Sequence, residues 1–424
     1  MARHGPLRGP WALARLGSGA APAEMAVDAT ARTLITGRAL RGFVDGSVAV
    51  LLPAYLLALG HDSLAVGVLG TATLLGSALA TLAVGAWGHH AAPRTLLLAA
   101  ALLMAATGAG FAAFATFVPL LVVAFVGTLN PGAGDVSVFL PLEHARLAGL
   151  AQTSAERTAL FARYSLAGSL SAAFGALAVG LPAWLAPRLG WAMVDALRAM
   201  FVLYAAIGLA IWVLYRRLPQ AAPGATQGTA PAPLGPSRTV IVKLAALFAV
   251  DSFAGGLVVH SLVSLWLMQR FGLSLAAAGA FFFWSGLASA ASQLVAPWLA
   301  RRIGLLNTMV FTHIPANVCL VAAALAPSLP VALALLLVRA LLSQMDVPTR
   351  TAYVMSVVTP AERAAAASFT TVPRSLASAA SPALAGALLG AGWLAAPLLL
   401  CGVLKIGYDL TLWRACRGHR LHGE

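Results

Sequence analysis

The chain has 424 residues, of which 60% are hydrophobic and only 9% are charged, whereas a soluble domain carries about 25% charged residues. This composition excludes a soluble globule, which needs more polar side chains to cover its surface, and indicates a protein with many membrane spans. The formal net charge of +14 does not indicate nucleic-acid binding, because the basic residues punctuate hydrophobic runs and do not gather with aromatic residues on a polar face.

Twelve hydrophobic segments follow a tail, residues 1–37, that is rich in Arg, Gly, Pro and Ala and in which Met25 is an alternative start. Each segment is near or above the ~20 residues that cross a bilayer as a helix. Helices are required because lipid offers no partner for unpaired backbone groups. The sequence therefore predicts an all-α membrane protein with helices at 38–60, 64–88, 95–115, 117–145, 158–185, 191–215, 240–269, 275–299, 304–326, 329–356, 363–391 and 394–415.

A stretch rich in Pro, Gly, Ala and Thr, residues 217–239, separates the sixth predicted helix from the seventh. Such a composition is typical of a flexible linker, so we expect six-helix bundles at 38–216 and 240–416 and a short tail at 417–424. Lys and Arg concentrate in alternate loops, which predicts that both termini and the linker are cytoplasmic. The expected location is the plasma or inner membrane.

The two halves of the chain repeat each other at an offset of about 206 to 211 residues. Asp45 in the first predicted helix matches Asp251 in the seventh, and the Arg163 stretch matches the Arg374 stretch. Two similar six-helix bundles in the same orientation predict a pseudo-two-fold axis along the membrane normal.

The sequence resembles the major facilitator superfamily over residues 38–415. Residues 337–341, which contain Arg339, are similar to the family's intramembrane arginine motif, and residues 381–386 are similar to its motif of small residues and proline. The family's loop motif is degraded at 85–94, and its second copy has Arg301 where Asp is expected. The resemblance implies a monomeric secondary transporter that works by alternating access, with helices one, four, seven and ten lining a cavity and five and eleven beside them.

Several charged residues in the predicted spans have an opposite charge one helical turn away. Such spacing places both side chains on one face of a helix. Except for the pair that contains the site candidate Asp45, we interpret these pairs as self-neutralised near the membrane interface, where long side chains reach the headgroups. The pairs are Arg41 with Asp45, Glu143 with Arg146, Asp195 with Arg198, and Lys405 with Asp409.

Other charges lie deep in the predicted spans. Asp251 stands about 11 residues into its helix, or ~16 Å at 1.5 Å per residue, which is near mid-bilayer. A charge at that depth requires an opposite charge or water, and Asp346 has two candidate partners, Arg350 and Arg339. The predicted substrate and proton site comprises Asp45, Asp135, Arg163, Asp251, Arg339, Asp346 and Arg374. Buried salt bridges that only fix helix packing are the alternative.

Two further features have two interpretations each. His260 and His313 are isolated histidines in predicted spans; helix-packing hydrogen bonds are the favoured role and a titratable relay is the alternative. The run Asn130-Pro131-Gly132 either kinks the fourth helix or interrupts it and exposes backbone groups to a substrate.

Other classes of membrane protein find no support in the sequence. An ATP-driven pump would need a phosphate-binding loop, and a membrane enzyme would need a metal or nucleophile motif. The three cysteines have neither disulfide nor zinc spacing. No cofactor, metal or nucleic-acid partner is expected, only a small-molecule substrate, protons and the lipid bilayer. A sensor or scaffold without transport activity remains an alternative.

The preferred function is proton-coupled efflux of a small organic solute, and proton-coupled uptake is the alternative. Proton coupling requires a carboxylate whose protonation exchanges an ion pair for substrate. Asp251 is the first choice, followed by its repeat mate Asp45 and then Asp346. Paired acids and arginines in a mostly apolar cavity suit zwitterions, organic anions or amphipathic drugs.

Overall fold

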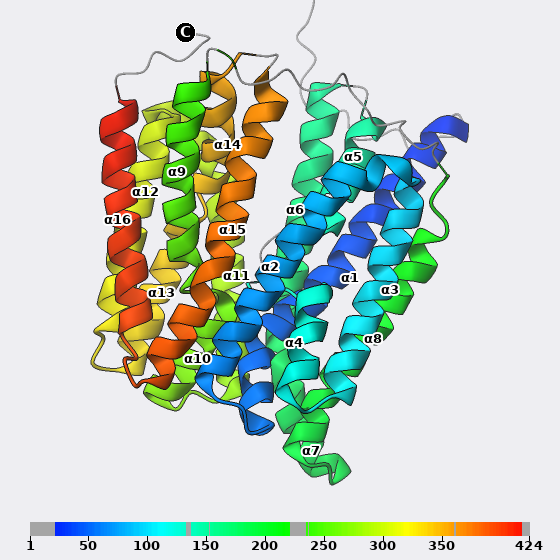
Figure 1. Ribbon diagram of the computed structural model, residues 1–424, viewed down its shortest axis with the longest axis vertical. Coiled ribbons are helices and arrows are strands. Elements are labelled where there is room, and N and C mark those ends of the chain that lie inside the picture. Colours follow the sequence, from blue (N-terminus) through cyan, green and yellow to red (C-terminus); the bar gives the residue numbers. More distant parts are fainter. Residues whose placement is uncertain are drawn as a thin grey trace, which may run out of the picture.

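The computed structural model describes residues 22–132, 137–151, 153–220, 235, 237–359 and 362–417. Every regular element in these ranges is helical (Figure 1). The first half of the chain contains α1 (Pro22–Ala58), α2 (Ser63–Trp87), η1 (Gly88–His90), α3 (Pro93–Ala113), α4 (Phe117–Val126), α5 (Phe139–Leu150), α6 (Ser154–Leu177), η2 (Ala178–Gly180), α7 (Leu181–Leu189) and α8 (Met193–Tyr215). We call these elements the N-half.

The second half of the chain, here the C-half, follows a linker of which residues 221–234 and 236 lie outside the described ranges. It contains α9 (Arg238–Gly256), α10 (His260–Phe271), α11 (Leu275–Ile303), α12 (Leu305–Ala324), α13 (Leu329–Ser343), α14 (Asp346–Val357), α15 (Arg363–Gly390) and α16 (Ala396–Cys416). The first helix begins at Pro22, inside the segment that the sequence assigned to the tail.

Within the described ranges, ten helical stretches are long and apolar enough to cross a membrane. The predicted spans at 117–145 and 363–391 are not among them. The first is divided into α4 and α5, and α15 is rich in Ala and Ser and carries arginines and two prolines along its length. The all-helical membrane architecture is confirmed, whereas the count of twelve spans stays a prediction.

Three predicted helices are interrupted, and local sequence explains each break. The chain leaves α4 before Asn130-Pro131-Gly132, where the Asn130 side chain accepts a hydrogen bond of 3.0 Å from the Gly132 N–H. The break after α9 follows Gly255-Gly256, a pair of poor helix formers. The break between α13 and α14 falls at Gln344, four residues before Pro348. Proline has no N–H to donate to the Gln344 carbonyl, and its ring clashes with that carbonyl.

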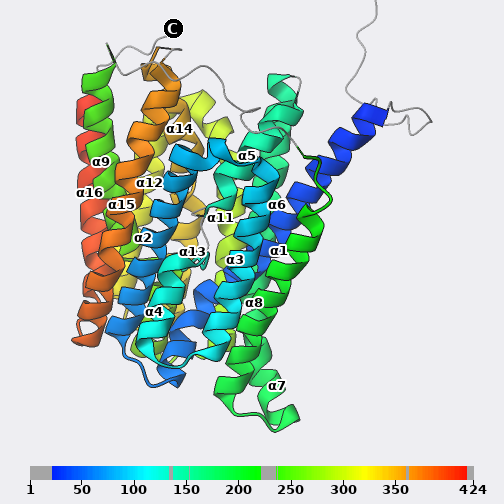
Figure 2. The ribbon, with the colours of Figure 1, turned by 45° about the vertical axis from the view of Figure 1, so that its right-hand side comes forward.

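The N-half and the C-half lie side by side, and α1 begins at the same end of the molecule at which α16 ends (Figure 1). Toward the opposite end, α2 and α15 touch closely (Figure 2). Gly67 and Gly386 meet there backbone to backbone, with no room for a Cβ on either. Because small residues let helix backbones approach in a membrane, these glycines fix the contact between the halves.

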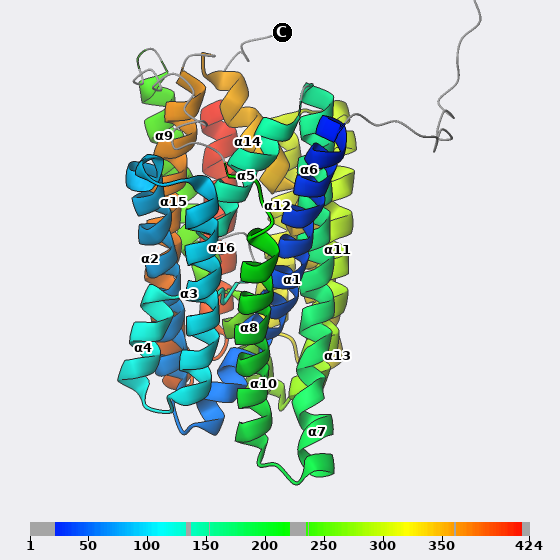
Figure 3. The same cartoon turned by 90° about the vertical axis from the view of Figure 1, so that its right-hand side faces the viewer.

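Hydrogen bonds accompany this contact. The Ala383 N–H donates to Thr71 Oγ1 at 3.0 Å, and Gln269 Nε2 donates to Ser63 Oγ at 2.7 Å. On the other side of the molecule, α6 runs beside α1 and α11 (Figure 3), and a Cβ at Gly279 would overlap the Ala176 carbonyl oxygen. The pairs α2 with α15 and α6 with α11 therefore join the halves on two sides, and α10 adds contacts to α1 and α2.

Candidate functional site

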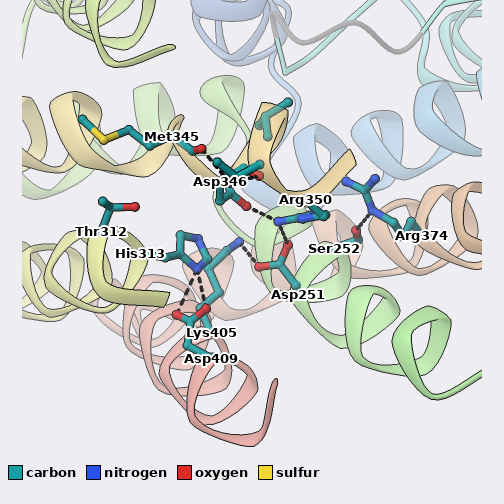
Figure 4. A network of polar contacts seen from close by, with 12 residues as sticks. Asp251, Ser252, Thr312, His313, Met345, Asp346, Arg350, Arg374, Lys405 and Asp409 are labelled. Atoms are coloured by element: carbon teal, nitrogen blue, oxygen red, sulfur yellow. Dashed lines mark hydrogen bonds and ion pairs between the residues drawn. The ribbon is translucent and has the colours of Figure 1, made fainter. Parts of the chain in front are cut away.

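A buried charge network occupies the interior of the C-half (Figure 4). Asp251 on α9 lies between two cations, accepting from Arg350 at 2.9 Å and from Lys405 at 2.5 Å. Arg350 also pairs with Asp346 one turn away, which decides between the two partners considered for that carboxylate. All four side chains are buried, so each charge is compensated within the network, as burial requires.

A contact between a histidine and a carboxylate lies next to this network. His313 Nδ1 is 2.9 Å from the Asp409 carboxylate, and both residues are buried. The predicted local pair of Lys405 with Asp409 is therefore wrong, because Lys405 reaches across to Asp251 on another helix. Arg374 lies to one side, where its Nε donates to Ser252 Oγ at 3.3 Å (Figure 4).

The N-half has its own buried network. Arg41 on α1 makes a bidentate pair with Glu143 on α5, with N–O distances of 2.7 and 2.8 Å. The hydroxyls of Tyr164 and Tyr215 also donate to this carboxylate. The predicted pairs Arg41 with Asp45 and Glu143 with Arg146 are therefore wrong, because a cross-helix fork between guanidinium and carboxylate is the stronger arrangement.

The remaining predicted site residues have different surroundings. Asp45 is buried, and its Oδ1 has no hydrogen-bond partner among the described residues. Arg339 is half-buried, and its Nε also has no hydrogen-bond partner among the described residues. Arg163 is exposed on α6, whereas its neighbour Tyr164 is buried. Asp135 lies outside the described residues.

A cavity of about 320 Å³ lies between the two halves. Each of the three helix breaks contributes to its wall: Gly132 follows α4, His260 begins α10 and Gln344 follows α13. A backbone hydrogen bond of 3.1 Å from the Ser261 N–H to the Pro131 carbonyl joins two of these breaks across the halves. The described residues of the lining are Arg38, Gly46, Val50, Gly132, Ser169, Ala172, Ala173, Ala176, His260, Phe282, Gly286, Ser289, Ala290, Gln293, Gln344 and Val347.

A larger and mostly apolar cleft of about 700 Å³ separates the far ends of α2 and α15. Thr81, Leu82 and Gly85 line it from the N-half, and Ala367 and Thr371 from the C-half. The two helices therefore touch near one end of the molecule and part toward the end at which the described chain starts and finishes (Figure 1).

Two halves around a central cavity form the plan expected from the resemblance described above, and the family comparison agrees. The profile of the Major Facilitator Superfamily matches residues 34–382. The chain belongs to the Major Facilitator Superfamily. Members of this family are transporters and not enzymes, so the protein is a membrane transporter of solutes.

Solved structures of superfamily members share the fold of this member. A bacterial homologue of the human lysosomal transporter Spinster superposes with a TM-score of 0.71 at 16% identity, over 95% of this chain and 98% of the other. The nucleoside transporter NupG gives 0.69 at 16% identity over 92% and 100%. The xylose transporter XylE from E. coli gives 0.69 at 15% identity over 91% and 96%.

One relative by sequence is the membrane protein YJR124C of Saccharomyces cerevisiae, described as uncharacterized. It is 24% identical to this superfamily member over 400 residues, which cover 85% of this chain and 88% of the other.

The cavity of this superfamily member is lined by residues that sequence reasoning did not select. Arg38, Gln293 and Gln344 belong to it, and His260 was assigned to helix packing. None of the predicted site residues that the structure describes lines it. The sequence does contain a signal for this cavity, namely the residues that break helices. Gly255-Gly256 and Pro348 mark two of the three breaks at which the chain lines the cavity. The described residues contain no cluster of three or more His, Cys, Asp or Glu able to hold a metal ion.

Proposed function

We propose that the protein is a secondary active transporter that moves a small organic solute through the central cavity by alternating access. The observation that carries the proposal is the position of this cavity at three helix breaks between the two halves. Interrupted helices at a substrate site are a feature of transporters, because the freed backbone groups can bind cargo. The contact between α2 and α15 at one end and the cleft between them at the other support a state open toward the chain termini.

The finer architecture belongs to the same proposal. Twelve spans form two six-helix bundles that are related by a pseudo-two-fold axis and rock against each other. The protein works as a monomer in the plasma or inner membrane, with both termini cytoplasmic. The α4–α5 segment and α15 supply the two spans beyond the ten apolar ones. In this orientation the cleft of about 700 Å³ opens to the cytoplasm.

We further propose that transport is coupled to protons through Asp251. In the structure this carboxylate neutralises part of the charge of both Arg350 and Lys405. Protonation would release both cations and so change the packing of α9 against α14 and α16. The network is set apart from the central cavity, so coupling acts through helix positions and not through direct exchange of proton and cargo.

Reconstitution into liposomes with an imposed pH gradient tests both proposals. With uridine, xylose and benzoate as probes, inside-acid liposomes accumulate solute by antiport and outside-acid liposomes by symport. Antiport, and hence efflux, is expected.

Asp251→Asn should abolish the dependence of solute accumulation on the pH gradient, whereas Asp195→Asn, in an exposed ion pair, should not. Unimpaired coupling in Asp251→Asn would exclude Asp251 as the proton site. No flux of any probe under either gradient would favour a sensor or scaffold.

A further inference from the structure

We propose that the cleft between α2 and α15 binds an acyl chain of an anionic phospholipid, and that Arg94 and Arg146 hold the phosphate of this lipid. The site is distinct from the central cavity, because the described linings of the two share no residue. The inference concerns the binding of a lipid and does not depend on the proposed transport of a solute.

The first support is the apolar wall of the cleft. The cleft measures about 700 Å³, and its described lining has no charged side chain. The polar side chains in this lining are the hydroxyls of Thr81, Ser368 and Thr371. Thr371 donates its hydroxyl to the Ala367 carbonyl of its own helix at 2.7 Å. Such a wall offers water few hydrogen-bond partners, whereas hydrocarbon requires none.

The second support is the position of the cleft, at the end where α2 and α15 part (Figure 2). Leu82 lines the cleft and is 38% exposed, and Phe369, next to the lining residue Ser368, is 46% exposed. Trp87 at the end of α2 is 67% exposed, and exposed tryptophans of membrane proteins gather at the level of the headgroups. The cleft therefore opens toward acyl chains and ends near the headgroups.

The third support is a pair of cations beside the N-half wall. Arg94 and Arg146 directly follow the lining residues Pro93 and Ala145. Arg94 is near enough to act electrostatically on Arg146, and among the described residues no carboxylate does so. The acid nearest to Arg146 along the chain, Glu143, already accepts from one arginine and two tyrosines. A phosphate bound by both cations would offset their mutual repulsion.

Both guanidinium groups keep donors for such a ligand. Arg94 donates to the Arg216 carbonyl, and Arg146 donates to the Pro219 carbonyl at 2.7 Å. A guanidinium has five N–H donors, and Arg94 Nε and Arg146 Nη1 make no hydrogen bond to the described residues. The remaining donors can therefore bind a phosphate while the contacts to the two neutral carbonyls persist.

A segment of this chain fits the cleft less well than a lipid. Residues 1–21, which lie outside the described ranges, contain three arginines and no acidic residue, so the cations beside the cleft repel them. Residues 221–234 of the linker carry no charge. An anionic phospholipid complements both the apolar wall and the two arginines.

Two lipids with the same acyl chains separate charge from apolar contact: dioleoyl phosphatidylglycerol, an anion, and dioleoyl phosphatidylcholine, a zwitterion. Native mass spectrometry of the purified full-length chain in detergent measures the affinity for each. Phosphatidylglycerol should bind about tenfold more tightly. Arg94→Gln combined with Arg146→Gln should make the two affinities equal, whereas Arg157→Gln, at an exposed position of α6, should change neither.

A second pair of variants tests the apolar wall and keeps the test decisive if the double variant does not fold. Ser368 is exposed and lines the cleft, so Ser368→Trp should fill part of it and weaken both lipids severalfold. Leu384→Trp, at an exposed position of the same helix outside the described lining, should weaken neither.

Three results would overturn the inference. Equal affinities of the unmodified chain for the two lipids would show that no cation selects the headgroup. An affinity for phosphatidylglycerol that Ser368→Trp leaves unchanged would place the lipid outside the cleft. Displacement of the lipid by a synthetic peptide of residues 1–21 would show that this tail is the better occupant. Because none of these measurements involves flux, their outcome is independent of the proposed transport function.

Discussion

Glu143 shows at the scale of a single residue how this protein keeps charge inside a membrane. Its carboxylate is fully buried and accepts both nitrogens of the Arg41 fork as well as two tyrosine hydroxyls. A carboxylate has room for about four such donors. The group is therefore saturated, and the removal of any one partner leaves a buried polar atom unpaired.

Glu143→Gln should accordingly destabilise the protein by about 3–5 kcal/mol, because it leaves the Arg41 guanidinium buried without an opposite charge. Replacement of both partners, as Arg41→Met with Glu143→Leu, should cost less than either single change. Chemical unfolding in detergent micelles measures the difference. Asp195→Asn, which breaks an exposed pair with Arg198, serves as a control and should cost less than about 1 kcal/mol. A double variant less stable than both single variants would contradict this account.

Glu362 gives a prediction for the dependence of stability on pH. It lies in the turn between α14 and α15, and hydrogen bonds from Ser237, Thr359 and the Gly235 N–H lower the pKa of its carboxyl to about 2. An unfolded Glu titrates near pH 4.3. The resulting stabilisation is therefore fully present above about pH 4.5 and is lost as the pH falls toward 2.

Thermal unfolding of the unmodified chain and of Glu362→Gln, followed from about pH 7 to pH 3, tests this. The unmodified chain should melt at the higher temperature near neutral pH, and the gap should shrink below about pH 4.5. A gap that stays constant down to pH 3 would show that these hydrogen bonds do not depend on the charge of Glu362.

Partner choice is the part of the site that the sequence predicted worst. Depth in a helix correctly marked Asp251 and Asp346 as buried charges. Spacing along one helix, however, favoured Lys405 with Asp409, although Lys405 bonds Asp251 and Asp409 bonds His313. Asp195 with Arg198, the predicted local pair that is confirmed, is also largely exposed. Spacing along one helix predicts the partner of an exposed charged side chain. The partner of a buried one comes from a neighbouring helix, whose position a single sequence does not give.

At the scale of the element, glycines set how closely α2 and α15 approach. A Cβ at Gly67 would overlap the Pro382 carbonyl oxygen, whereas one at Gly85, farther along the same helix, would meet nothing within 4 Å. Backbone atoms cannot yield as a flexible side chain can, so an added methyl group at Gly67 must push the helices apart.

Gly67→Ala should therefore favour the state in which α2 and α15 separate, and Gly85→Ala should not. The readout is maleimide labelling of Thr71→Cys, a position in the contact, in a chain whose Cys319, Cys401 and Cys416 are replaced by Ala. Labelling should rise severalfold with Gly67→Ala. Unchanged labelling with an unchanged melting temperature would show that the contact tolerates the methyl group.

Element boundaries were predictable to the extent that hydrophobicity controls them. The sequence placed α2, α8 and α11 within a few residues of their positions. It read the α9–α10 and α13–α14 regions as unbroken spans, because the hydrophobic run continues through both breaks. The causes, Gly255-Gly256 and Pro348, are backbone effects that a hydropathy window averages away.

At the scale of the whole molecule, the halves should fold as separable units that associate. The ion pairs of the two buried charge networks each join members of the same half, while glycine contacts and hydroxyl or amide hydrogen bonds join one half to the other. Residues 1–220 and 235–424, expressed together as two chains, should copurify and bind the same ligands as the intact protein. Size-exclusion chromatography of the detergent extract measures this. Two halves that elute separately would show that the connecting segment is needed for assembly.

The two buried charge networks, Arg41 with Glu143 and Asp251 with Arg350, Asp346 and Lys405, share no residue with the described lining of the central cavity. Natural selection can therefore alter what such a protein recognises, one wall residue at a time, without disturbing the counterions on which folding depends. Proteins built on this plan can therefore change their substrates in evolution while the packing of their helices stays the same.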